Sequence, residues 1–169
     1  DKIQFLEEMA NTIRQDILQM VVKAGSGHVG GPLGMADVFT ALYFHILKHD
    51  PKKPDWADRD RVVLSNGHIC PVLYATMARA GYFPVEELQT LRKFGSRLQG
   101  HPHRTSLPGL ETSSGPLGSG LSQAVGMAIG ARMNANPSTH STTAQGGEQS
   151  RTTGSSPEGS RLSRAGRAD

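Results

Sequence analysis

Three histidines lie in glycine-containing turns of the 169-residue chain, where imidazole chemistry and exposed main chain could act together. His28 lies within the glycine-rich segment 25–34, His68 follows an Asn-Gly dipeptide, and His101 follows a glycine. A neutral imidazole can donate or accept a proton near pH 7, so each histidine is a candidate to bind hydroxyl or phosphate oxygens and to move protons. For His28 and His68 the spacing alone leaves an alternative open, an incidental histidine in a flexible or helix-capping turn.

The glycines at positions 25, 27 and 30 have the spacing of a dinucleotide-binding loop, but their context is wrong for one. Such a loop follows a strand and opens a helix. Here the glycines follow a long apolar pattern typical of a helix, so we reject dinucleotide binding. The segment is either a loop that another group can approach closely or a flexible connection between helices.

A second glycine-rich turn, Gly115 to Gly120, precedes an apolar helical pattern. Its three glycines and Pro116, on either side of Leu117, predict a tight turn whose N–H and C=O groups are exposed at the start of a helix. Such a main chain can hold an anion or a polar heterocycle. The alternative interpretation is an ordinary turn.

The other histidines and the single cysteine do not indicate a metal site. His101 and His103 are two residues apart, but metal binding needs at least a third ligand and nothing nearby supplies one. His45 and His49 are explained by the favourable position of a cation at a helix C-terminus. Cys70 is the one cysteine, which excludes an internal disulfide and predicts a reducing, cytoplasmic location.

The apolar pattern of the first 134 residues predicts an α/β fold. Apolar residues at intervals of three and four predict helices over 3–24, 35–46, 68–80, 85–94 and 119–133. The short apolar run 61–65 predicts a buried parallel strand. Strand, turn and helix make half of a βαβ unit, so we expect a parallel sheet flanked by helices, helix-rich in this part. His68 would then lie at the sheet edge where such folds bind ligands.

The composition changes abruptly after about Asn134. Residues 135–169 contain no aromatic side chain and one large aliphatic side chain, Leu162. They cannot bury enough apolar surface to offset the entropy of ordering. We therefore predict a domain over residues 1–134 and a disordered or out-of-frame tail over residues 135–169.

Charge and hydropathy exclude several kinds of partner. The net charge of +3 is small and gives no support for nucleic-acid binding. No apolar run approaches the roughly 20 residues of a membrane span. The first residues also lack the basic flank and apolar stretch of a secretory signal. The sequence thus predicts neither a nucleic acid nor a membrane as partner.

Four motifs, taken in order, resemble the N-terminal region of transketolases. They occupy residues 23–34, 61–68, 100–102 and 112–122. This resemblance implies a thiamine diphosphate-dependent enzyme that transfers a two-carbon ketol unit between sugar phosphates. A related enzyme such as dihydroxyacetone synthase would use the same histidines.

The resemblance also implies roles for individual residues. In that family the residues matching His28, His68 and His101 line the active site and contact substrate hydroxyls, with His68 also near the diphosphate. The turn 115–117 matches the stretch whose main chain meets the cofactor, whereas His103 matches no clear functional position. The cofactor would carry the carbanion chemistry, so the role of the protein would be orientation and electrostatics.

Departures from the family pattern concern the metal and the partner. The family binds Mg²⁺ and the diphosphate through a Gly-Asp-Gly motif expected shortly after Met133, whereas residues 142–148 contain Gly-Gly-Glu without an aspartate. We therefore assign no metal ligands. The domain that supplies a catalytic glutamate from a partner is also missing, so we expect an N-terminal fragment or subunit, inactive alone, that pairs with a second copy or a C-terminal subunit. The alternative is a non-catalytic partner-binding module.

Overall fold

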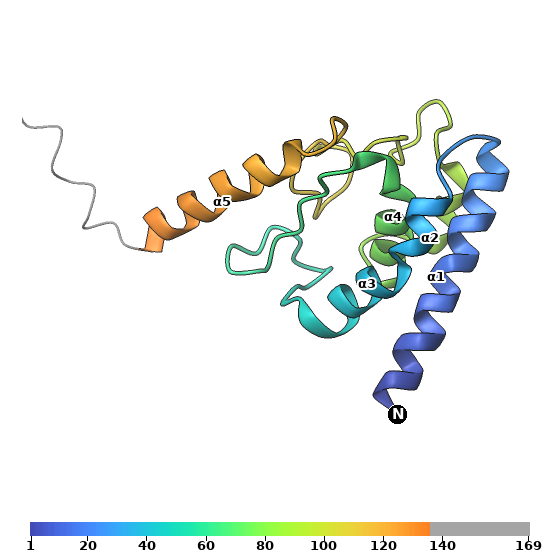
Figure 1. Cartoon of the computed structure of the whole chain (residues 1–169), viewed down its shortest axis with the longest axis horizontal. Helices are drawn as coiled ribbons and strands as arrows, with labels where there is room; N and C mark the ends of the chain where they lie inside the picture. Colours follow the sequence, from blue (N-terminus) through green and yellow to red (C-terminus); the bar gives the residue numbers. More distant parts are fainter. Residues whose placement is uncertain (136–169) are drawn as a thin grey trace, which may run out of the picture. The chain divides into compact units, whose positions relative to one another are not determined.

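The computed structural model describes residues 1–135, of which Asp1–Arg132 form one compact unit. The long helix α1 (Lys2–Ala24) lies against α3 (Ala36–Ala41) and α4 (Cys70–Arg79), and the short helix α2 (Gly30–Gly34) joins them (Figure 1). The remaining helical elements are the π-helical turn η1 (Leu42–Ile46), the 3-10 turns η2 (Gly67–Ile69) and η3 (Val85–Thr90), and α5 (Ser119–Ala135). No helix of residues 1–135 is both long enough and apolar enough to cross a membrane.

Helix α1 confirms the helix predicted over residues 3–24. A side-chain oxygen of Asp1 accepts a hydrogen bond from the N–H of Ile3 at 3.2 Å and caps the first turn. The apolar stripe of the helix buries Ile13 and Ile17 among others. The helix ends at Gly25, whose φ of +66° is the left-handed conformation that glycine adopts without strain.

Helix α4 lies at the centre of the unit and confirms the helix predicted after His68. Every residue from Cys70 to Ala78 is buried, against α1, α3 and η3. Arg79 at its end donates two hydrogen bonds to the carboxylate of Asp16 on α1, at 2.7 and 2.8 Å. This bidentate pair fixes α4 against α1, and α4 in turn carries His68 at its N-terminal side.

The other predicted helices form with different bounds. The helix expected over 35–46 is α3 followed by η1, in which the N–H of Leu47 bonds to the carbonyl of Leu42 at 2.8 Å. The helix expected over 85–94 is only η3. It stops before Arg92, whose φ of +59° lies in the left-handed region and cannot continue a helix.

The strand predicted over residues 61–65 is not formed, and the predicted sheet is not confirmed: residues 1–135 contain no strand. A parallel strand needs a second strand beside it to complete its ladder. Here the hydroxyl of Ser114 donates a hydrogen bond to the carbonyl of Leu64. The N–H of Gly118, directly before α5, donates to the carbonyl of Ser65. Leu64 is nevertheless buried, as the prediction requires.

Helix α5 confirms the helix predicted over 119–133 and carries an exposed apolar row. Its large side chains recur every four residues and remain exposed: Leu121, Val125, Ile129 and Met133. The predicted tail 135–169, apart from Ala135 at the end of α5, lies outside the described residues.

Candidate functional site

The imidazoles of His28 and His68 lie close together, tilted toward each other, beside a narrow crevice. Their ring centroids are 4.9 Å apart and the rings are inclined by 58°. His28 comes from the loop between α1 and α2, and His68 from η2 at the start of α4. The crevice between them is walled by Gly27, Cys70, Pro71, Leu91, Arg92 and Gly100. Two of the three predicted histidines therefore share one site.

A glycine on α2 permits this approach of the two histidine-bearing segments. A methyl group at Gly31 would lie 2.8 Å from Cγ2 of Ile69, the residue after His68. Only a residue without a side chain lets α2 pack this closely on η2. The glycine-rich segment predicted as a loop thus contains a short helix whose role is close packing.

His101 borders a wider hollow that adjoins the crevice. This groove has a volume of about 610 Å³ and is lined by Arg92, Gln99, Gly100, His101, Pro102, His103, Ser113 and Ser114. Arg92 and Gly100 line both hollows, so the groove and the crevice meet there. His101 therefore lines an open groove, whereas His28 and His68 line an adjoining crevice that is too narrow to admit a water molecule. Nδ1 of His103 lies 3.1 Å from the hydroxyl oxygen of Thr105 and 3.3 Å from that of Ser106. The ring of His103 therefore contacts residues of the same turn.

Ser114 ties the turn 115–117 to the segments that carry His68 and His101. Its N–H donates to the carbonyl of Pro102 at 3.0 Å, and its hydroxyl donates to the carbonyl of Leu64 at 2.5 Å. A methyl group at Gly67 would lie 2.8 Å from the carbonyl carbon of Ser114. The sequence did not point to this serine, because nothing in a Ser-Ser dipeptide within a turn indicates that one serine contacts Pro102, Leu64 and Gly67 together.

The main chain of Gly115 and Leu117 is open. An added methyl group at Gly115 would meet no atom within 4 Å, and the Leu117 side chain is 71% exposed. Within residues 1–135 no hydrogen bond is recorded to either residue. Their peptide groups can therefore accept or donate hydrogen bonds to a bound molecule, as the sequence analysis expected of this turn.

Comparison with known proteins decides the family. Residues 6–145 match the family model described as "Transketolase, thiamine diphosphate binding domain". The chain belongs to the transketolase family. The resemblance found in the four sequence motifs is thus confirmed, and the described helices are those of the N-terminal, thiamine diphosphate-binding part of a transketolase.

Transketolase relatives from several organisms match most of this chain. It is 49% identical over 127 residues to a transketolase of Buchnera aphidicola. The aligned residues make up 75% of this chain and 19% of that protein. It is 46% identical over 134 residues to the 6-deoxy-6-sulfo-D-fructose transketolase subunit SqwG of a Clostridium species, covering 79% of this chain and 49% of that subunit. The chain thus spans about a fifth of one relative and about half of the other.

A solved transketolase structure supports the same assignment. The crystal structure of transketolase from Campylobacter jejuni is similar with a TM-score of 0.73 and 44% identity, over 79% of this chain and 21% of that one. The residues 6–145 matched by the family model include all three histidines and the turn 115–117. The fold is therefore that of the corresponding region of transketolases.

Arg92 is a site residue that the sequence did not point to. It is the one residue other than glycine with a positive φ among residues 1–135. Its N–H donates to the carbonyl of Leu98 at 2.8 Å, which closes the turn before His101. A methyl group at Gly100 would lie 2.9 Å from Nη1 of Arg92, so glycine there makes room for the guanidinium. No composition or spacing signal marks a left-handed arginine.

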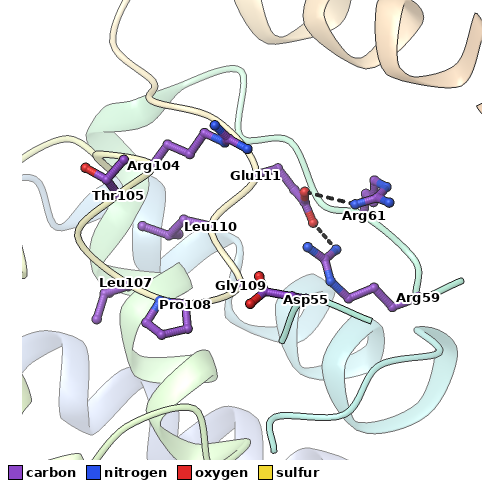
Figure 2. Close-up of a pocket in the computed structure, with 10 residues that line it drawn as sticks. All are labelled: Asp55, Arg59, Arg61, Arg104, Thr105, Leu107, Pro108, Gly109, Leu110 and Glu111. Carbon is purple, nitrogen blue, oxygen red and sulfur yellow. Dashed lines mark hydrogen bonds and ion pairs between the residues drawn. The ribbon is translucent and has the colours of Figure 1, made fainter. Parts of the chain in front are cut away.

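A third hollow of this transketolase-family chain, of about 470 Å³, lies beside the loop 104–111. Figure 2 shows Glu111 between Arg59 and Arg61, with Arg104 and Asp55 at the rim. Glu111 bonds to Arg59 and lies 3.5 Å from Arg61. The carboxylate thus offsets much of the arginine charge, and we regard this cluster as a structural link between two loops.

The described residues do not hold a candidate metal centre. Among residues 1–135, no group of three or more His, Cys, Asp or Glu side chains lies in an arrangement that could bind a metal ion. The segment 142–148, where the sequence analysis looked for the family's metal motif, lies outside the described residues. We therefore assign no residue to Mg²⁺.

Proposed function

We propose that this chain is the N-terminal part of a transketolase that transfers a two-carbon ketol unit between sugar phosphates with thiamine diphosphate. The observation that carries the proposal is the approach of the His28 and His68 rings to 4.9 Å, beside the groove of His101, in a chain of the transketolase family. Three imidazoles around adjoining hollows suit a polyhydroxylated substrate, because each ring can donate to one oxygen and accept from another.

The proposed roles come from the resemblance to transketolases, and the positions of the groups are compatible with them. His28, His68 and His101 would bind substrate hydroxyls and pass protons to and from sugar oxygens, with His68 also near the diphosphate. The main chain of Gly115, Pro116 and Leu117 would contact the rings of the cofactor. The open peptide groups of Gly115 and Leu117 fit that role. When bound, thiamine diphosphate supplies the electron sink for the carbanion.

The same arrangement would serve a dihydroxyacetone synthase, since the histidines contact features that both substrate classes share. Mg²⁺ is expected of the complete enzyme, but residues 1–135 offer no cluster of ligands for it. The roles proposed for the three histidines do not involve the metal.

We further propose that the functional enzyme is assembled from more than this chain. The chain matches 49% of the SqwG subunit, a protein described as a transketolase subunit. The partner would be a C-terminal transketolase subunit or a second copy that supplies the catalytic glutamate. We place the assembly in the cytoplasm, because the single cysteine is not used in a disulfide.

Calorimetric titration of the purified chain with thiamine diphosphate, with and without Mg²⁺, tests the proposal. We expect micromolar binding that is weakened by His68→Ala and unaffected by His45→Ala, an exposed histidine on η1 outside the site. Circular dichroism of each variant controls for folding. Absence of binding by a folded wild-type chain would contradict cofactor binding by this polypeptide.

That negative result would favour a second candidate function, a non-catalytic partner-binding module. The exposed apolar row of α5 supports this alternative, because contiguous exposed apolar surface often marks an interaction site. The two candidates are separated by the same titration, since a binding module needs no affinity for thiamine diphosphate.

A further inference from the structure

Two buried side chains of α4 hold the main chain immediately before His101. The hydroxyl of Tyr74 donates to the carbonyl oxygen of Gln99 at 2.9 Å. The thiol of Cys70 donates to the carbonyl oxygen of Gly100 at 3.1 Å, and also lies 3.5 Å from the carbonyl oxygen of Gln99. Cys70 and Tyr74 are one helical turn apart and therefore lie on the same face of α4.

The position of this pair along α4 relates it to two site histidines at once. Cys70 is two residues after His68, and the clamped carbonyl of Gly100 belongs to the residue directly before His101. One turn of α4 thus positions both histidines. It positions His68 because that residue lies two positions before Cys70, and it positions His101 through the hydrogen bonds from Cys70 and Tyr74. Because α4 is buried from Cys70 to Ala78, it is a rigid reference for both.

Both donors keep their protons over the physiological range. Tyr74 is 0% and Cys70 is 1% exposed. Burial raises the pKa of the Cys70 thiol to about 12 and raises the pKa of the Tyr74 phenol as well. A carbonyl oxygen can only accept, so the two hydrogen bonds require the protonated thiol and phenol.

The loop retains other anchors when these two bonds are removed. The side chain of Leu98 is fully buried, and its carbonyl accepts the N–H of Arg92. On the far side of His101, the carbonyl of Pro102 accepts the N–H of Ser114. The hydrogen bonds from Tyr74 and Cys70 therefore control the local placement of residues 99–101 rather than the attachment of the whole loop.

We propose that Tyr74 and Cys70 are positioning residues that hold the His101 segment in register with His68. The catalytic meaning of this placement rests on the proposed transketolase function, whereas the placement itself can be measured in the chain alone. Neither residue is assigned a contact with substrate or cofactor.

Backbone amide resonances of residues 100 and 101 and the imidazole resonances of His101 test the proposal in the 169-residue chain. We expect Tyr74→Phe, which loses one hydrogen bond to this segment, to shift the amide resonances of Gly100 and His101 and the His101 ring resonances. Amide resonances in α1 should keep their wild-type positions. Shifts of equal size throughout the chain would show a purely structural role and overturn the proposal.

Tyr82→Phe is the matched control. The hydroxyl of Tyr82 lies 3.0 Å from Nδ1 of His49, so this variant loses the same kind of bond away from the His101 loop. It should leave the amides of residues 100 and 101 and the His101 resonances unchanged. If Tyr82→Phe acts on them as strongly as Tyr74→Phe, the effect is not specific and the proposal fails.

Variants at Cys70 give a second, independent measurement. Cys70→Ala should also shift the amide resonances of Gly100 and His101, and Cys70→Ser, which retains a donor, should keep them close to their wild-type positions. In Tyr74→Phe the thiol, the single cysteine of the chain, should react faster with a disulfide reagent than in Tyr82→Phe. Identical behaviour of the Ala and Ser variants would contradict a hydrogen-bonding role.

These readouts need no cofactor, so they separate the two proposals. If thiamine diphosphate fails to bind but Tyr74→Phe shifts the resonances of residues 100 and 101 selectively, the proposed function fails and the placement stands. If the cofactor binds and Tyr74→Phe leaves His101 unaffected, the placement fails and the proposed function stands.

Discussion

The N–H of Gly120 donates to the hydroxyl oxygen of Ser65 at 3.1 Å, and the two backbones are in direct contact. A methyl group at Gly120 would lie 2.6 Å from Cα of Ser65. The first turn of α5 is thereby fixed on the segment that leads to His68. Backbone atoms cannot rotate away as a flexible side chain can, so this contact leaves no room for a larger residue.

Gly120→Ala should therefore destabilise the fold. We expect the free energy of unfolding to fall by about 1–3 kcal/mol, the usual cost of overpacking a close contact. Gly126→Ala is the control on the same helix, because a methyl group there would meet no atom within 4 Å. Alanine is the better helix former, so this variant should be neutral or gain up to about 1 kcal/mol. Urea unfolding of both variants checks the prediction, which a similar loss in each would contradict.

Breaking the pair between Arg59 and Glu111 should cost more than breaking an exposed pair. The two side chains are only 9% and 7% exposed. Glu111→Gln leaves a buried guanidinium without its counter-ion, and we expect a loss of about 3 kcal/mol in the free energy of unfolding. Asp37→Asn removes the corresponding charge from the exposed pair with Arg14 and should cost less than about 1 kcal/mol. Chemical denaturation measures both, and equal losses would be the contrary outcome.

The buried thiol and phenols should make the fold sensitive to alkali. Burial raises the pKa of Cys70 to about 12 and raises the pKa of Tyr43 and Tyr74. A group with a raised folded-state pKa stabilises the fold below its unfolded pKa, and this contribution is lost as the pH rises toward the folded pKa. For Cys70 the window runs from its ordinary value of 9.0 to about 12.

We therefore expect the free energy of unfolding to fall above about pH 9, by up to about 1.4 kcal/mol per pH unit for each such group. Denaturation curves at a series of alkaline pH values measure this slope. Cys70→Ser removes one of the titrating groups and should make the slope shallower. A stability that stays constant through the window, or rises, would show that these groups do not carry raised pKa values in the folded chain.

The helices were predictable because the apolar residues of their buried faces recur at intervals of three and four in the sequence. The pattern of Ile13 and Ile17 places α1 correctly, and the left-handed glycine at position 25 marks its end. The strand over 61–65 was predicted wrongly for a different reason. Its apolar run is genuine and Leu64 is buried, but strand pairing depends on a neighbour that residues 1–135 do not include.

The site was predictable only in part. His28, His68 and His101 stand out because each directly follows a glycine, and the structure places His28 and His68 at a crevice that adjoins the groove of His101. The residues that hold those loops together, such as Ser114, make contacts across long stretches of sequence. Such contacts follow from tertiary packing, which no local pattern encodes.

His68→Ala and His101→Ala should separate cofactor binding from turnover in the assembled transketolase of which we propose this chain to be a part. The resemblance to transketolases assigns the diphosphate to His68 and only the substrate to His101, and the two residues line different hollows, a crevice and the groove beside it. His101→Ala should lower turnover by about 100-fold or more, the usual contribution of a general acid–base group, and leave the affinity for thiamine diphosphate nearly unchanged. His68→Ala should also weaken that affinity, because its ring is assigned to the diphosphate as well. Ketol-transfer rates measured over a range of cofactor concentrations distinguish the two effects, and a His101→Ala enzyme with wild-type turnover would refute its assignment to the substrate.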